Sequence, residues 1–568
     1  MKVSDYIVEY LIHRGIEHVF GYPGGMVTHL MDSFSKYQDR IVSHITYHEQ
    51  SAAFAACGYA QASGKVGVAY ATSGPGATNL ITGICNAYFD SIPTLFITGQ
   101  VNLSEIKGNL RVRQRGFQET DIVSIVEKIT KYAGQIEDAG QIKWYLDYAF
   151  LIAEQGRKGP VLLDIPMNIF RAEIIPEKLT GYLPAEASSQ PSVHTDLCQI
   201  LQTELSKARR PVLLLGNGLK ISGTVSEMRK VSARLGIPVV STMPAVDVIS
   251  DHALNYGFIG AYGSRTANFI TAKSDLLISL GARLDIRQVG AKRESFAPDA
   301  KILRIDIDPG ELKYKVHSNE IPIHTDVKTA ISILSQLTEL PVYTDWIHVC
   351  NEIRHKLSEI DQQWPNEIIS ALSELLPDDA VITADVGQNQ VWVAQSLKVK
   401  EKQRICFSGG HGAMGYSLPA AIGCALAGGK TVCSFNGDGG IQMNIQELQT
   451  VVREKLPIKI ILINNFALGM IRHFQEMYFD SNYFQTVPAG GYTVPDFEAI
   501  AKAYGLKYQA VDTLSDIHNR LLDQNSPELI EVRIPEKTYV YPKLEFGKPN
   551  QDQEPLLDRK LYEYLCSL

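Results

Sequence analysis

Short apolar runs rich in β-branched residues alternate with helical patterns along the whole chain, and this alternation constrains the fold more than any other feature. Clear strand-like runs lie at 92–98, 160–165, 210–216 and 458–463. Strands that alternate with helices usually pair in parallel and carry helices on both faces of the sheet. The sequence therefore predicts an α/β protein built from mainly parallel sheets flanked by helices.

The length and two linker-like segments predict a division into three domains. The chain has 568 residues, which corresponds to roughly three to four domains. The segment 183–193 is rich in small and turn-forming residues, and the segment 341–365 also has the character of a linker. The predicted boundaries are 1–180, 190–340 and 360–540 for the domains and 541–568 for a C-terminal tail.

The composition points to small molecules as partners. The net charge of −8 is spread without long runs of one sign, which argues against a nucleic-acid surface. The longest apolar stretch, 418–427, contains Pro419 and Gly423 and is too short to span a membrane. The eight cysteines lack metal-ligand spacing, and the N-terminus lacks the apolar core of a signal peptide. We therefore expect a cytoplasmic protein.

A glycine-flanked acid follows one buried strand, and an asparagine pair follows the next. The run 431–435 leads into Gly437-Asp438-Gly439, and the strand 458–463 delivers Asn465. Glycines let the backbone approach a phosphate closely, and carboxylate and amide oxygens suit Mg2+. Either piece alone would be an ordinary turn or strand end. On consecutive strand ends, they predict a diphosphate bound through a divalent metal.

The first domain has two glycine-rich turns of its own, at 20–26 and 71–79, each at the end of an apolar run. Such turns at strand ends commonly face a ligand. Between them, Glu49 opens a helical pattern. Taken alone, this acid would be an ordinary first-turn glutamate favoured by the helix dipole.

With these motifs, the chain resembles thiamine-diphosphate enzymes of the acetohydroxyacid synthase (acetolactate synthase) type over nearly its whole length. The resemblance implies a pyrimidine-binding first domain, a central domain that holds FAD, and a diphosphate-binding third domain. Besides the motifs above, the shared segments are 48–50, 72–79, 117–119, 387–390, 408–415 and 469–470.

The resemblance also implies roles for individual residues. The Glu49 carboxylate would hydrogen-bond the aminopyrimidine ring, so that the cofactor's own 4′-nitrogen removes the proton from its C2 carbon. Gly25 and Gln118 would hydrogen-bond a developing oxyanion. Met414 would prop the two cofactor rings into contact, and the Gly412 carbonyl would receive the 4′-amino group.

Further cofactor contacts follow from the same resemblance. The metal ligands would be Asp438, Asn465 and the Ala467 backbone. In the middle domain, glycines at strand ends followed by arginine or aspartate suit the diphosphate and ribose of FAD, although related enzymes without flavin share this domain. The remaining implied thiamine contacts are Gly74, Asn79, Gly387, Gln388, Asn389, Gly437, Gly439, Gly440, Ala467, Gly469 and Met470, and the FAD contacts are Gly216, Gly218, Arg283 and Asp306.

The substrate pocket departs from the family pattern. Phe117, Arg287 and Phe474 are assigned to it by resemblance, and Phe474 stands where tryptophan is usual. Other departures are Tyr262, Ile286, Arg115 and His411. A pocket changed in this way could accept a larger or more polar carbonyl compound than pyruvate.

We therefore expect a carboligase that decarboxylates pyruvate and transfers the two-carbon unit to a second carbonyl. Pyruvate as acceptor would give 2-acetolactate, which is the default product. A keto-sugar acceptor is the alternative within this chemistry, and an inactive cofactor-binding subunit is the alternative from another class.

The resemblance implies a homo-oligomer whose active sites lie between subunits. Glu49 would come from one subunit and Asp438 from the other. The tail from Tyr541 to Leu556 resembles an arm that closes over the site and excludes water. A small regulatory subunit remains open as a further partner, and no nucleic acid or membrane is expected.

Overall fold

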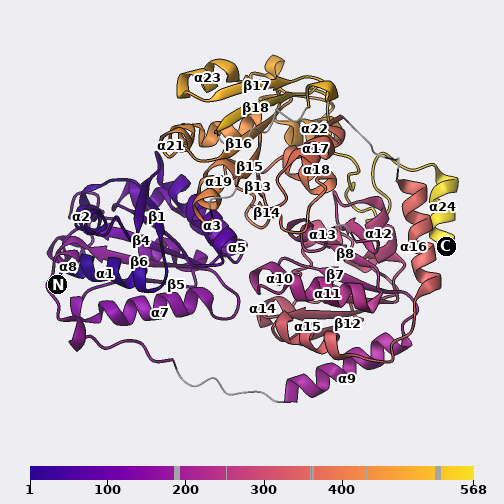
Figure 1. The fold of residues 1–568 in the computed structure, drawn as a ribbon, viewed down its shortest axis with the longest axis horizontal. Coiled ribbons are helices and arrows are strands. Elements are labelled where there is room, and N and C mark those ends of the chain that lie inside the picture. Colours follow the sequence, from indigo (N-terminus) through magenta and orange to yellow (C-terminus); the bar gives the residue numbers. More distant parts are fainter. Residues whose placement is uncertain (185–191, 251, 359, 361–363, 429–430, 518–525) are drawn as a thin grey trace.

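The computed structural model describes residues 1–184, 192–250, 252–358, 360, 364–428, 431–517 and 526–568. These residues form three six-stranded sheets, and every strand pairing among them is parallel. Helices flank each sheet, and Figure 1 shows the first domain at the left, the middle domain at the lower right and the third domain at the top. The predicted fold class is confirmed.

The first sheet has the strand order β2-β1-β3-β4-β6-β5. Its central strands β3, β4 and β6 are buried along their whole length, which explains their nearly continuous apolar sequences. The strands are β1 (His18–Gly21), β2 (Val42–Ile45), β3 (Gly67–Ala71), β4 (Thr94–Gln100), β5 (Tyr132–Gln135) and β6 (Pro160–Pro166). The helices are α1 (Val3–His13), α2 (Thr28–Lys36), α3 (Glu49–Ser63), α4 (Pro75–Asn79), α5 (Ile81–Phe89), α6 (Ile122–Val126), α7 (Ile142–Glu154) and α8 (Met167–Phe170).

The middle sheet has the order β12-β11-β10-β7-β8-β9, the doubly wound order of dinucleotide-binding domains. Its strands are β7 (Pro211–Leu215), β8 (Val239–Ser241), β9 (Asn255–Phe258), β10 (Leu276–Leu280), β11 (Lys301–Asp306) and β12 (Glu320–His324). Its helices are α9 (Ser192–Lys207), α10 (Gly218–Ile221), α11 (Val225–Leu235), α12 (Arg265–Ala272), α13 (Ile286–Val289), α14 (Pro309–Leu312) and α15 (Val327–Gln336).

The third sheet repeats the strand order of the first, as β14-β13-β15-β16-β18-β17. Its strands are β13 (Val381–Ala384), β14 (Arg404–Phe407), β15 (Val432–Gly437), β16 (Ile458–Asn464), β17 (Lys507–Val511) and β18 (Glu528–Arg533). The helices of this part are α17 (Trp364–Leu375), α18 (Gln388–Ser396), α19 (Ser417–Leu426), α20 (Asp438–Met443), α21 (Leu448–Arg453), α22 (Gly469–Tyr478) and α23 (Phe497–Tyr504).

Each sheet has a point at which its strand order reverses, between β1 and β3, between β7 and β10, and between β13 and β15. Open α/β sheets bind ligands outside the carboxyl ends of the strands at such a switch point. The topology therefore gives three candidate binding positions in one chain.

The first and third domains pack through α3 and α19, and their buried apolar residues form one shared core. The two helices touch at glycines. A Cβ atom on Gly58 would lie 2.1 Å from the Ala420 carbonyl oxygen, and a Cβ on Gly423 would lie 1.9 Å from the Ala55 oxygen. No larger residue fits at this crossing.

The segment 341–365 was expected to be a linker, and the structure differs. It contains helix α16 (Thr344–Leu357), which buries Trp346, Cys350 and Ile353 in the core of the middle domain. Helix α24 (Arg559–Ser567) at the C-terminus contributes Leu565 to the same core. The chain thus returns to its middle domain after completing the third, as Figure 1 shows at the right. Among the helices of the described residues, we find none long and apolar enough for a membrane crossing.

Candidate active site

Glu49 lies at the switch point of the first sheet, at the first position of α3. The preceding His48 caps the helix by accepting a hydrogen bond from the Gln50 backbone N–H. Glu49 is only 7% exposed, and its Oε2 accepts a hydrogen bond from the Asn79 amide at 3.0 Å. Its Oε1 lies 3.1 Å from where a Cβ on Gly76 would stand, so this glycine leaves room beside the carboxylate.

Gln118 and Gly25 lie near the same strand ends. Gln118 has a φ of 62°, and a Cβ added to Gly74 would lie 3.0 Å from the Gln118 Cβ. Gly25 opens a short 3₁₀ turn, and the Met26 N–H that follows donates to Thr72 Oγ1 at 3.2 Å. A Cβ on Gly25 would meet nothing within 4 Å, so a ligand can approach its backbone. Glu49, Asn79, Gly74, Gln118 and Gly25 form the first half-site.

Asp438 follows β15 at the switch point of the third sheet and begins α20. It is 3% exposed, and its carboxylate accepts the backbone N–H groups of Gly439 at 2.9 Å and Ala467 at 3.1 Å. Burial raises the pKa of Asp438 to about 7. A cation bound here would stabilise the ionised carboxylate.

Asn465 follows β16 and faces the same place. Its amide nitrogen donates to Gln388 Oε1 at 3.1 Å, and Gln388 in turn donates to the Thr538 carbonyl at 3.0 Å. These two hydrogen bonds orient the Asn465 side chain through its amide nitrogen and leave its amide oxygen available to a ligand. A Cβ on Gly469 would lie 1.8 Å from Gln388 Oε1, so the packing of α22 here requires glycine.

Asn389 joins the ends of β13 and β15. Its amide donates to the carbonyls of Asp385 at 3.0 Å and Phe435 at 3.3 Å. A Cβ on Gly387 or on Gly437 would lie 3.3 Å from Asn389 Oδ1. Gly387 has a φ of 137°, which favours glycine.

The loop 408–415 lies over the Gly437–Gly440 turn. The Met414 methyl lies 3.4 Å from the position of a Cβ on Gly439. Gly412, with a φ of 70°, has open space around it. Met470 follows Gly469 on α22 and packs beside the core of the third domain. These residues, with Asp438, Asn465, Ala467, Gln388 and Asn389, form the second half-site.

Two acids that hold this loop were missed by sequence reasoning. Asp385 accepts the Gly415 N–H at 2.9 Å, and Asp90 of the first domain accepts the N–H groups of Gly409 and Gly410 at 3.2 and 2.7 Å. Burial raises the pKa of each carboxyl to about 7. Asp385 had a signal, because it follows a strand directly. Asp90 had none, because its partners lie more than 300 residues away in sequence.

Among the described residues, no hydrogen bond, ion pair or ring contact joins the first half-site to the second. The start of α3 does meet the third domain, but through other residues: Ser51 donates to Asn444 at 3.0 Å, and the Tyr47 N–H donates to Glu447 at 2.8 Å. The described residues also contain no group of three His, Cys, Asp or Glu side chains that could hold a metal. A metal at Asp438 therefore needs amide, backbone and ligand oxygens.

The middle domain has a cavity of about 330 Å³ at its switch point. Gly218, Arg283, Arg287 and Asp306 line it. Gly216 does not line it but allows close packing, since a Cβ there would lie 2.0 Å from the Gly281 oxygen. The cavity thus has a glycine at which a ligand can come close to the backbone, and it also has guanidinium groups and a carboxylate.

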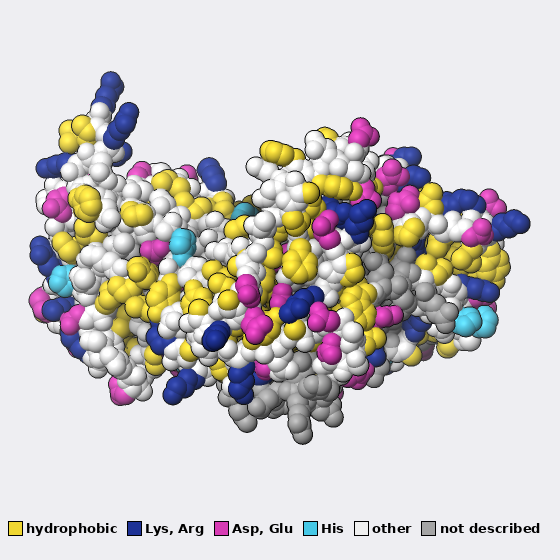
Figure 2. Space-filling view, turned by 90° about the horizontal axis from the view of Figure 1, so that it is seen from above, with side chains coloured by type: hydrophobic (Ala, Val, Ile, Leu, Met, Phe, Trp, Pro, Cys, Tyr) yellow, Lys and Arg dark blue, Asp and Glu magenta, His cyan; other side chains and the backbone are white. Residues whose placement is uncertain are grey.

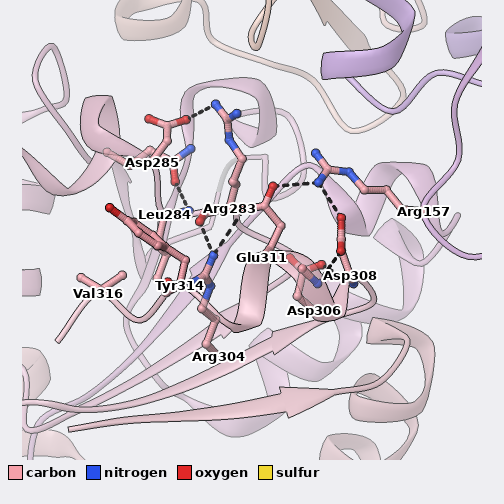
Figure 3. A network of polar contacts seen from close by, with 12 residues as sticks. Arg157, Arg283, Leu284, Asp285, Arg304, Asp306, Asp308, Glu311, Tyr314 and Val316 are labelled. Carbon is pink, nitrogen blue, oxygen red and sulfur yellow. Dashed lines mark hydrogen bonds and ion pairs between the residues drawn. The ribbon is translucent and has the colours of Figure 1, made fainter. Parts of the chain in front are cut away.

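A polar network supports one wall of this cavity (Figure 3). Arg157 reaches over from the first domain and pairs with Asp308 at 2.9 Å and Glu311 at 2.7 Å. The buried Arg304 donates to the Tyr314 carbonyl at 2.9 Å and to the Arg283 carbonyl. The network therefore fixes the backbone that carries Arg283 and ties the first domain to the middle one.

The three residues assigned to the substrate pocket lie in different places. Phe474 is 39% exposed on α22, and its ring packs on Tyr478, which reaches Phe546 of the tail. The Arg287 guanidinium lies 5.9 Å from the Tyr262 ring centre. Phe117 is 79% exposed on the first domain and makes no ring contact with Phe474, Tyr262 or Arg287 among the described residues.

His411 has a different environment from the other departures. Its ring stacks on Phe89 of the first domain, with ring centres 5.6 Å apart and planes at 6°. The side chain therefore fills a contact between domains, and its aromatic face is already occupied.

Sequence comparisons match all three domains. Models of the thiamine pyrophosphate enzyme domains match residues 1–125 (N-terminal TPP binding domain), 199–337 (central domain) and 385–532 (C-terminal TPP binding domain). The acetolactate synthase large subunit of Lactococcus lactis subsp. lactis is 38% identical over 558 residues, which cover 96% of this chain and 94% of that protein. The chain belongs to the thiamine pyrophosphate enzyme family.

Other similar proteins in the thiamine pyrophosphate enzyme family are also acetolactate synthases. The isozyme 2 large subunit of Escherichia coli K12 is 35% identical, with 97% of this chain and 99% of the relative covered. The probable acetolactate synthase large subunit of Methanocaldococcus jannaschii is 36% identical, with 94% and 92% covered. The resemblance stated from the motifs is confirmed, and the chain is a thiamine-pyrophosphate-dependent enzyme of this kind.

Proposed function

We propose that this protein decarboxylates pyruvate and transfers the resulting two-carbon unit to a second carbonyl compound. With a second pyruvate as acceptor, the product is 2-acetolactate. The observation that carries the proposal is the buried Glu49–Asn79 pair at one switch point, in a chain whose other thiamine-type switch point carries Asp438 and Asn465. Thiamine diphosphate, when bound, supplies the nucleophilic carbon that this reaction needs.

The first half-site has the groups that this chemistry requires of the protein. Glu49 would hold a hydrogen bond to the pyrimidine ring, and its orientation is supported by Asn79. The Gln118 amide and the Gly25 N–H would donate to the oxygen on which negative charge develops. Gly74 permits Gln118 to lie this close to the strand end.

The second half-site suits a diphosphate and Mg2+. Asp438, Asn465 and the Ala467 carbonyl would be the protein ligands, and Mg2+ commonly completes its shell with phosphate oxygens and water. Gly437, Gly439 and Gly440 keep side chains away from the diphosphate. Gln388 orients Asn465, and Asn389 holds the two strand ends together.

The middle cavity suits FAD. Glycines at a doubly wound switch point allow the backbone to approach a diphosphate. Arg283 would pair with phosphate, and Asp306 would accept from a ribose hydroxyl. Since FAD has no net redox task in the main reaction of the resembled enzymes, we assign it a structural role.

The assembly we propose is a homo-oligomer in which each active site combines the first half-site of one subunit with the second half-site of another. The proposal is supported by the two half-sites, which share no hydrogen bond, ion pair or ring contact among the described residues of one chain. Residues 541–556 would close over the site and exclude water. The relatives named above are large subunits, so a smaller partner chain is to be sought by copurification.

A second acceptor class is favoured by one observation. Phe474, Tyr478 and Phe546 form an aromatic group between α22 and the tail, and Arg287 lies over the Tyr262 ring in the middle domain. Aromatic faces and a guanidinium suit a polyhydroxylated carbonyl compound better than the methyl group of pyruvate. A keto-sugar is therefore the alternative acceptor.

Product analysis tests the proposal. The purified protein would be supplied with thiamine diphosphate, Mg2+ and pyruvate, alone and with a panel of second carbonyl compounds. Acetolactate formed rapidly from pyruvate alone supports the default reaction, and slow turnover that accelerates with a keto-sugar supports the alternative. No loss of pyruvate under any condition contradicts both, and would leave an inactive cofactor-binding subunit.

A further inference from the structure

A basic arm extends from the first domain beside the first half-site. We define it as residues 107–116. Arg111, Arg113 and Arg115 are all exposed, and Leu110 before them and Val112 among them are 56% and 49% exposed. Figure 2 shows Lys and Arg side chains gathered on a projection at the first-domain side of the molecule. A stretch with alternating arginines and exposed apolar residues is unusual for a surface that faces only water.

The base of the basic arm is held by one buried carboxylate. Glu119 accepts the backbone N–H groups of Lys107 at 2.7 Å, Arg115 at 2.8 Å and Gly116 at 3.2 Å. The Gln114 amide adds a bond to the Glu119 carbonyl at 3.1 Å. The two ends of the arm are therefore fixed to one point, and the arginines between them are presented from a defined loop.

That point lies next to the proposed reaction centre. Glu119 directly follows Gln118, whose Cβ would lie 3.0 Å from a Cβ on Gly74. The carboxylate that closes the arm thus also fixes the backbone beside Gln118. If the arm binds a charged group, that group would belong to the compound that reacts near Gln118.

The positive charge of the basic arm is not neutralised by the protein. Within the described part of the chain, Arg111, Arg113 and Arg115 form no ion pair. The acids nearest in sequence accept other hydrogen bonds: Glu105 from Asn102, Glu119 from backbone N–H groups at the base of the arm, and Asp121 from Ser124. The Arg115 guanidinium makes one long hydrogen bond, 3.5 Å to the Ile106 carbonyl, and its other N–H groups are available to an anion together with those of Arg111 and Arg113.

We propose that the basic arm binds the phosphate group of a phosphorylated second substrate. This inference rests on the proposed function, because it concerns the acceptor of the two-carbon unit. Guanidinium groups match phosphate oxygens with paired, charge-assisted hydrogen bonds. One arginine is enough for the single carboxylate of pyruvate, whereas three suit a phosphate ester or a diphosphate.

The test compares acceptors that differ only in phosphate. Dihydroxyacetone is compared with dihydroxyacetone phosphate, and a free 4-keto-6-deoxyhexose with its nucleoside diphosphate ester, each with pyruvate, thiamine diphosphate and Mg2+. We expect kcat/KM for at least one phosphorylated member to exceed that of its partner about tenfold or more at low salt, and this preference to shrink as salt rises. The two pairs distinguish a simple ester from a diphosphate.

The variant R111Q/R113Q should remove most of this preference and leave kcat/KM for the unphosphorylated acceptors within about twofold. The matched control K128Q/R171Q removes two exposed positive charges from the same domain, and should keep the preference. In the double variant, a higher KM for the phosphorylated acceptor with an unchanged kcat would further indicate that the arm binds the phosphate.

Three outcomes overturn the inference. In the first, kcat/KM for the phosphorylated acceptors is no higher than for their unphosphorylated partners. In the second, the double variant lowers kcat/KM equally for both members of a pair. In the third, sedimentation shows that the double variant dissociates the oligomer, which would make the arm a contact between subunits. In the first two cases the variant still decarboxylates pyruvate, and in the third the wild-type protein still does. If pyruvate is not consumed under any condition, the proposed function itself fails.

Discussion

At the scale of single residues, burial decides what each acid in this protein can do. Glu49 and Asp438 are almost fully enclosed, but each has polar neighbours that fix its orientation. A carboxylate held in this way is ready to bind a partner without reorganising first, which is the main requirement of a catalytic acid or a metal ligand.

The change Glu49→Gln keeps the size and the Asn79 contact but removes the charge. We expect pyruvate consumption to fall by roughly 10²-fold or more, in the range that proton-transfer groups usually contribute. Thiamine diphosphate binding, followed by fluorescence quenching or calorimetry with Mg2+, should weaken far less than the rate. Asp438→Ala is the contrasting variant, because metal-dependent cofactor binding itself should be lost.

Asp164 in β6 predicts a pH effect on stability. Burial raises the pKa of its carboxyl to about 6, although Thr98, Gln100 and Gln135 donate hydrogen bonds to it. An unfolded aspartate has a pKa of about 3.9. The folded state therefore binds the proton more tightly, and the free energy of unfolding should fall as pH rises from about 4 to about 6.

Calorimetric Tm values at pH 4.5 and pH 7 measure this effect. Between these two pH values, the free energy of unfolding should fall by about 1–3 kcal/mol less in Asp164→Asn than in the wild type. Asp39→Asn, at an exposed position, is the control. Parallel pH curves for the wild type and Asp164→Asn would show that Asp164 titrates no differently in the folded and unfolded states.

At the scale of helices and strands, the crossing of α3 and α19 fixes how the first and third domains meet. Because Gly58 and Gly423 approach backbone atoms of the opposite helix, each glycine sets the separation of the two helices. The start of α3 carries Glu49, and α19 follows the loop that carries Met414. Both half-sites therefore depend on this crossing.

Gly423→Ala should force the helices apart. The added Cβ would lie 1.9 Å from the Ala55 oxygen, and we expect a loss of about 2 kcal/mol or more, at the upper end of overpacking costs. Differential scanning calorimetry would detect it as a lower Tm. Gly428→Ala, where a Cβ meets nothing within 4 Å, should change stability by less than about 0.5 kcal/mol. Equal Tm values for the two variants would contradict the close packing.

Local patterns were enough to predict strands, their parallel pairing and the residues at their carboxyl ends. Gly437 and Asp438 could be predicted as site residues from the glycine turn that follows an apolar run, because strand ends and turns are determined by neighbouring residues. The same reasoning failed for α16, whose polar and charged face made 344–357 look like a linker although Trp346 and Ile353 are buried. It also missed Asp90, because a contact with Gly409 depends on how two domains pack and leaves no mark on the residues beside it.

At the scale of the whole molecule, the proposed pairing of half-sites from two subunits predicts complementation between inactive variants, because the described residues show no hydrogen bond or ion pair that joins the two half-sites of one chain. The variants Glu49→Gln and Asp438→Ala should each be inactive. When they are coexpressed, half of the dimers should be mixed, and each mixed dimer should regain one of its two sites. The expected activity is therefore about a quarter of the wild-type value.

Coexpression with two differently tagged chains, followed by purification through both tags, gives the mixed dimer alone. Its activity should approach half that of the wild type. No activity above that of either parent would show that Glu49 and Asp438 act within the same subunit, and the proposed assembly would be wrong.

The return of the C-terminus to the middle domain has a consequence for synthesis on the ribosome. Leu557 and Leu565 complete the apolar core there, Tyr562 packs against Phe269, and Lys273 bonds the Cys566 carbonyl. Nascent domains ordinarily fold in the order in which they emerge. Here part of the core of the second domain to emerge stays uncovered until residues 557–565 have been translated, so the middle domain completes its folding after the third domain has emerged.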